Sequence, residues 1–115
     1  MPGLDIVGVM AIDERLAQAI VQCILTVTKP DRIILFGSAA TGQMTRDSDI
    51  NLLVVAPSPS NNIEERVRLR RSLRGLGFPF NVFITATERF EESKNIFGGI
   101  AYPAHKYGRV MCEAA

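Results

Sequence analysis

The sequence contains no tryptophan, a single histidine and only two cysteines among its 115 residues. Cys23 and Cys112 are too few and too far apart to form the disulfide framework of a small secreted domain. Together with His105 they also lack the close spacing of a structural zinc site. The chain therefore has to be stabilised by an ordinary apolar core, and we expect it in the cytoplasm.

Long apolar runs and a strong excess of charge are also missing. No run approaches the about 18 apolar residues that a membrane-spanning helix requires. Residues 1–10 lack the basic start and apolar stretch of a signal peptide. The net charge is +1, so bulk charge gives no support to a nucleic-acid or membrane partner. With 47% hydrophobic and 22% charged residues, the composition predicts one soluble domain that spans residues 1–115.

Apolar periodicity and turn residues divide the chain into helices and strands. Apolar residues at helical spacing predict a helix over residues 12–28, and the polar PSPSNN stretch (57–62) predicts a loop. The predicted fold class is α/β (α+β), a small sheet flanked by helices. The other predicted strands span residues 32–36, 49–56, 80–85 and 109–112. A helical turn is predicted over 38–43 with Ser38 as its N-cap, and helices are predicted over 63–73, 87–95 and 101–107. Asn62 is expected to cap the first of these helices, and a capping box from Thr85 to Glu88 is expected to open the second.

Residues 36–55 (FGSAATGQMTRDSDINLLVV) carry the chemistry of the chain. Gly37 and Ser38 end one apolar strand and offer backbone N–H groups and a hydroxyl, which suit phosphate oxygens. Ten residues, 39–48, separate Ser38 from Asp49, which begins the next strand. Residues two apart in a strand share a face, so Asp49 and Asn51 are predicted to point toward the Gly37-Ser38 segment.

This pattern resembles the polymerase-beta-like nucleotidyltransferase superfamily, and most closely its minimal nucleotidyltransferase (MNT, antitoxin-type) branch. The family pattern is Gly-Ser, about ten residues, then Asp, apolar, Asp, apolar. Here the second aspartate is Asn51. The third carboxylate of the family sits in a later strand, and its best counterpart is Asn81 in Phe80-Asn81-Val82-Phe83. The alternative, one residue out of register, places Asn81 away from the site.

The resemblance implies a mixed sheet, a Gly-Ser phosphate site, and two divalent metals held by three carboxylates. Of these carboxylates only Asp49 is present. Asp49 is thus the expected catalytic carboxylate, Asp49 and Asn51 are the expected metal ligands, and Gly37 and Ser38 the nucleotide-binding residues. Losing each carboxylate is expected to weaken Mg²⁺ binding by about 1.5 to 3 kcal/mol. Asp47 is the nearest spare carboxylate that could replace a ligand.

Two functions follow from the resemblance. One is a degenerate nucleotidyltransferase that binds Mg²⁺ weakly, as Mg-ATP, and acts through a protein partner of the toxin–antitoxin type. The alternative is an active enzyme that transfers AMP from ATP to a hydroxyl, such as a tyrosine of the partner. The family implies a small helical HEPN-type partner, and a homodimer is also compatible with the sequence.

Two surfaces are candidates for contact with such a partner. Arg66, Arg70 and Arg74 are four residues apart and form one stripe of the helix predicted over 63–73, which we call the arginine row. It is either a solvated face or a docking surface for an acidic partner or an RNA backbone. The apolar tail, comprising Phe97, Ile100, Val110 and Met111, belongs either to the core or to an interface.

Overall fold

The structure is a computed structural model that describes residues 12–45, 47–57 and 62–114. Four strands form one sheet in the order β3-β2-β1-β4. In chain order the elements are α1 (Glu14–Leu25), β1 (Arg32–Phe36), α2 (Ser38–Thr41), β2 (Ile50–Ala56), α3 (Asn62–Leu73), a 3₁₀ turn η1 (Arg74–Leu76), β3 (Phe80–Ala86), α4 (Thr87–Ser93), α5 (Ala101–Tyr107) and β4 (Arg109–Glu113).

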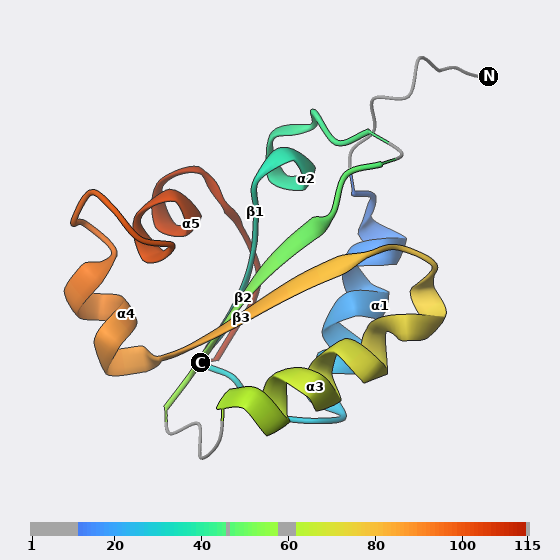
Figure 1. Cartoon of the computed structure of the whole chain (residues 1–115), viewed down its shortest axis with the longest axis horizontal. Helices are drawn as coiled ribbons and strands as arrows, with labels where there is room; N and C mark the ends of the chain where they lie inside the picture. The colour runs from blue at the N-terminus through green and yellow to red at the C-terminus, as the bar shows by residue number, and fades with distance from the viewer. Residues whose placement is uncertain (1–11, 46, 58–61, 115) are drawn as a thin grey trace.

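The sheet is mixed, as the family resemblance implies. β1 pairs antiparallel with both β2 and β4, whereas β2 and β3 run parallel. Helices α1 and α3 lie on one side of the sheet and α4 and α5 on the other, while α2 follows the end of β1 (Figure 1). The prediction of a small mixed sheet flanked by helices is confirmed.

Strand β2 is apolar along nearly its whole length because it is covered on both faces. Its alternate residues Ile50, Leu52 and Val54 pack in one buried cluster with residues of α1 and α3. Leu53 and Val55 pack in a second cluster that contains Phe90. The half-buried Asn51 interrupts this run at one end of the strand, so the sheet ends in a polar site.

The boundaries of helices α1 and α2 differ from the predictions. Helix α1 ends at Leu25, short of the predicted residue 28, and the side chain of Asp13 caps its start by accepting from Leu16 N at 2.8 Å. The predicted N-cap role of Ser38 is wrong, because Gly37 is the N-cap and Ser38 is the first helical residue. Of the loop predicted over 57–62, residues 58–61 lie outside the described residues.

The predicted capping box at Thr85 to Glu88 is also wrong. Ala86 is the N-cap of α4, and no side chain hydrogen-bonds to the cap. The hydroxyl of Thr87 instead donates to the carboxylate of Asp31, which lies just before β1. This hydrogen bond ties the start of α4 to the start of the inner strand β1, so a long-range contact replaces the local one. Within the described ranges, none of the helices has the length and apolar character needed to cross a bilayer.

Gly108 gives a test of this packing. It joins α5 to β4, and a Cβ placed there would lie 2.2 Å from the carbonyl oxygen of Ala104 and 2.9 Å from that of Leu35. Neither backbone group can yield easily, so we expect Gly108→Ala to lower the free energy of unfolding by about 1 to 3 kcal/mol. Urea denaturation measures this change.

Gly75 is the matched control, because nothing lies within 4 Å of a Cβ placed there. Gly75→Ala should change the free energy of unfolding by less than about 0.5 kcal/mol. Equal effects of the two substitutions would contradict the close packing of α5 against β1.

Candidate functional site

The site begins where β1 meets α2, at Gly37. This residue has φ of 80°, and a Cβ placed on it would lie 2.7 Å from Nδ2 of Asn51. The pairing of Phe36 with Asn51 in the sheet brings the two segments this close. Glycine is therefore required at position 37 for two reasons: the backbone is left-handed, and Asn51 leaves no space for a Cβ.

Helix α2 is a short turn that starts directly above this contact. Amides of Ala40 and Thr41 donate back to the carbonyl of Gly37 at 3.1 and 3.3 Å. The N–H groups that precede them, including that of the half-buried Ser38, have no acceptor within the helix, as at any helix start. They lie beside the exposed Gly37, so the segment can offer N–H donors to an anion.

The polar side chains of β2 and β3 meet beside Gly37. Asn51 and Asn81 are direct neighbours in the parallel pairing, and Asp49 immediately precedes β2. The Asn81 amide donates from Nδ2 to Oδ2 of Asp49 at 2.9 Å and to Oδ1 of Asn51 at 3.1 Å. Asn81 thus shares a face with the other two, and the register that would turn it away is excluded. We call these three residues the amide cluster.

In the amide cluster, the NH₂ group of Asn81 bridges two oxygens that a cation would otherwise have to hold together. A carboxylate at this position has no proton to donate at neutral pH and would repel Asp49. The amide therefore lets the cluster close without any metal. Hydrogen bonds to a charged acceptor are worth about 1.5 to 3 kcal/mol when well formed, and solvent weakens this one because Asp49 and Asn81 are exposed.

The described residues do not provide a strong metal site. Among them, no group of three or more histidine, cysteine, aspartate or glutamate side chains could hold a metal ion. Asp47 is exposed in the turn before Asp49 and does not complete such a group. Mg²⁺ prefers several carboxylate oxygens, and the amide cluster has one carboxylate. The donor set fits a metal that arrives already bound to another ligand, and does not fit the family's two metals.

Sequence reasoning missed a cavity on the same face of the sheet. It has a volume of about 460 Å³, and its lining includes Leu53 and Phe83. These residues follow Asn51 and Asn81 by two positions along β2 and β3, so their side chains share the face of the amide cluster. The ring of Phe83 also lies 5.8 Å from that of Phe36. The alternation Asn-x-Leu and Asn-x-Phe is the signal that could have predicted this apolar floor.

Comparisons with known proteins identify the family and the fold of the chain. The sequence profile of the Nucleotidyltransferase domain family matches residues 18–100. Two solved structures share the fold. One, described as a toxin-antitoxin with AMP-PNP, has a TM-score of 0.67 at 19% identity, over 85% of this chain and 73% of the other. The second, a mutant of the toxin-antitoxin MntA-HpeT, has a TM-score of 0.64 at 18% identity, over the same shares. A search of curated proteins gives no match.

The amide cluster can be tested by adding charge to it. We expect Asn81→Asp to place two carboxylates side by side and to raise the pKa of one of them in the folded protein. Because the folded state then holds a proton more tightly than the unfolded chain, the variant should be most stable below about pH 4 and lose stability as the pH rises to 7. The loss should be about 1 kcal/mol, since both groups are exposed.

Asn81→Ala is the control, because it removes the same hydrogen bonds without adding a charge. Chemical denaturation at several pH values compares the two variants, with and without Mg²⁺. We expect Mg²⁺ to recover stability in the aspartate variant alone. The same pH profile in both variants would show that Asn81 does not face Asp49 in solution.

Proposed function

Because this chain belongs to the nucleotidyltransferase domain family, we propose that it retains a nucleotide site, has a degenerate metal site, and acts through a protein partner. The amide cluster carries this proposal. Its single carboxylate, Asp49, has to serve where the family uses three. Without Mg²⁺ held by the protein itself, activation of an attacking hydroxyl lacks both a charged centre and a nearby base.

Nucleotide binding needs less from the protein than transfer does. A triphosphate brings its own Mg²⁺, so the site has only to add Asp49 to a metal that is already mostly coordinated. The backbone of Gly37 and the hydroxyl of Ser38 then contact phosphate oxygens. We therefore infer weak binding of Mg-ATP, with Asn51 as a neutral ligand at most. One of the structurally similar proteins is described with AMP-PNP, which supports a nucleotide triphosphate as the ligand.

A protein partner is the second part of the proposal. Both structural neighbours are described as toxin–antitoxin assemblies, and the family resemblance implies a small helical HEPN-type protein. The segment after α4 is strongly apolar on its surface: Ile96 is 61% exposed and Phe97 87%. Phe97, Ile100 and Val110 are exposed, so the interpretation of the apolar tail as core is wrong for these three residues. Exposed apolar side chains of this kind support an interface.

The alternative function is transfer of AMP from ATP to a hydroxyl, such as a tyrosine of the partner. The observation that favours it is that Asp49 is exposed and is joined through Asn81 to Asn51, which lies beside Gly37. Activity would then depend on charge supplied by the partner or by the nucleotide. Its chemical requirement is in-line attack on the α-phosphate while the triphosphate is held.

The proposed nucleotide site predicts a specific loss of affinity. Asp49→Ala should weaken Mg-ATP binding about tenfold, because it removes the only carboxylate of the amide cluster. Isothermal titration with Mg-ATP measures this effect. Asp47→Ala removes an equal charge two residues away and should leave the affinity within about twofold. Equal losses in the two variants would indicate that only the overall charge matters.

A second prediction separates the two functions. The unmodified chain should transfer little or no AMP to a hydroxyl acceptor, whereas Asn51→Asp with Asn81→Asp should bind Mg²⁺ more tightly, on the order of ten- to a hundredfold per carboxylate. Radiolabelled ATP measures transfer, with a helical partner protein as acceptor. Robust transfer by the unmodified chain that Asp49→Ala abolishes would establish the alternative function.

A further inference from the structure

Strand β3 is an edge of the sheet, paired on one side with β2. Its sequence, Phe-Asn-Val-Phe-Ile-Thr-Ala, has no charge and no proline. Edge strands of soluble proteins usually carry a lysine, a proline or a bulge, because the free backbone groups of an uncharged edge can pair with another chain. The residues of β3 therefore provide no such protection against pairing with another chain. Whether another chain can pair there depends on the elements beside the strand.

The nearest charged elements are α3, which carries Arg66 and Arg70, and the turn η1 that follows it and begins with Arg74. In the described part of the chain, Arg66, Arg70 and Arg74 form no ion pair, whereas Arg68 on the same helix lies 3.7 Å from Glu64. The net charge of the chain is only +1, so this is a local concentration of positive charge. These exposed cations repel one another only weakly in water, but together they attract an anion that binds beside all three.

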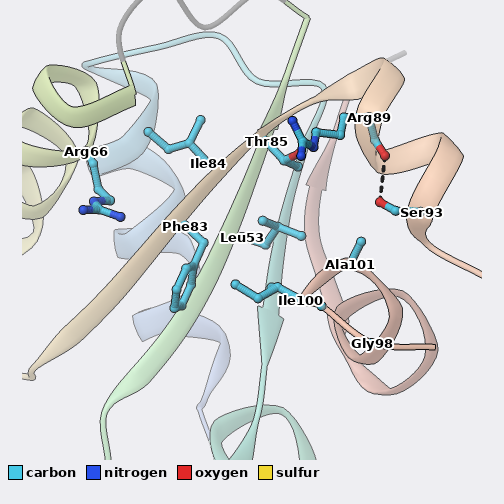
Figure 2. Close-up of a pocket in the computed structure, with 11 residues that line it drawn as sticks. Leu53, Arg66, Phe83, Ile84, Thr85, Arg89, Ser93, Gly98, Ile100 and Ala101 are labelled. Atoms are coloured by element: carbon cyan, nitrogen blue, oxygen red, sulfur yellow. Dashed lines mark hydrogen bonds between the residues drawn. The ribbon is translucent and has the colours of Figure 1, made fainter. Parts of the chain in front are cut away.

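Two hollows place these arginines beside β3. Arg66 lines the cavity of about 460 Å³ together with Phe83 and Ile84. Arg70 and Arg74 line a second hollow of about 400 Å³ together with Val67, Arg71 and the segment Gly77 to Phe80. Figure 2 shows Arg66 and Ile84 on one side of β3, and Leu53 and Ile100 on the other. The first hollow therefore extends around the edge of the strand.

The spacing of the arginine row matches that of a strand. Side chains four apart on a helix are separated by about 6 Å along its axis. Side chains two apart on a strand are separated by about 6.6 Å. Helix α3 runs opposite to β3, since Arg66 lies beside residues 83–84 and Arg74 beside residues 78–80. Three arginines can thus face three successive side chains on one face of an added strand.

We propose that the outer edge of β3 accepts an extended, acidic segment of a protein partner as a fifth strand. Its backbone pairs with β3, and its alternate acidic side chains lie along the arginine row. Apolar side chains on its other face enter the hollow floored by Leu53 and Phe83. The inference rests on the proposed protein partner, but it does not depend on the nucleotide site.

Other occupants fit less well. A second copy of this chain would pair β3 with β3, but this strand has no acidic residue and the copy would bring a second arginine row into the interface. RNA would satisfy the arginines, but it cannot supply the regular backbone pairing of a strand. RNA sites also use exposed aromatic rings beside the cations, whereas the aromatic rings that line the two hollows are half-buried (Phe78 and Phe83) or buried (Phe80).

A synthetic peptide in which glutamate alternates with valine tests the proposal. Titrated into the ¹⁵N-labelled full chain, it should shift the amide resonances of β3 and α3. Arg70→Ala with Arg74→Ala should weaken its binding about tenfold. Arg68→Ala is the matched control and should leave the affinity within about twofold, because Arg68 is already paired. Mg-ATP binding, measured on the same variants, should be unchanged, which separates this surface from the nucleotide site.

Three further arms can overturn the proposal. The same peptide with alternate backbone nitrogens methylated keeps its charge but cannot pair as a strand, so it should fail to bind. Equal binding of the methylated peptide would show that the surface binds charge without strand pairing. Binding of a lysine–valine peptide as tight as that of the glutamate peptide would exclude the arginine row. Single-stranded RNA that binds more tightly than the glutamate peptide, with the same loss in the double variant, would make nucleic acid the ligand.

Discussion

The register of β2 is the constraint on which both the core and the site depend. Phe36 pairs with Asn51 on one side of this strand, and Asn81 pairs with it on the other. A slip of one residue would exchange the two faces. It would turn Asn51 into the apolar layer beneath α1 and bring Ile50 out beside Gly37. That slip would bury the Asn51 amide among apolar side chains without its hydrogen-bond partner Asn81, and the cost of burying an unpaired amide opposes it.

Hydrogen bonds between side chains hold the amide cluster together, and these bonds need no metal ion. Three carboxylates at these positions would repel one another until a cation was bound. Asn81 instead donates to both Asp49 and Asn51, so the site is already satisfied. A site of this kind is compatible with the proposed function, in which the chain binds Mg-ATP weakly and acts through a protein partner. The same amides remove the charge that phosphoryl transfer requires.

The two surfaces proposed for a partner differ in their physical character. The apolar residues after α4 offer exposed surface that a partner can bury, and such burial contributes affinity with little selectivity. The arginine row beside β3 offers regularly spaced charge and a free strand edge, which select for an acidic segment in one register. A partner that used both would contact opposite sides of the sheet, since α3 and α4 flank it on different faces (Figure 1). An extended segment reaching from a folded body fits that arrangement.

The sequence by itself determined the strands and the family of the chain. Short apolar runs between turn residues predicted β1 over residues 32–36 and β3 to within one residue, because such runs are a local feature of the sequence. Only the tertiary structure decided how these strands meet. That Asn81 faces Asp49, that Thr87 bonds to Asp31 instead of capping α4, and that the arginine row lies along a free edge all depend on strand order. Strand order joins residues about 30 to 60 positions apart, and no local pattern in the sequence records it.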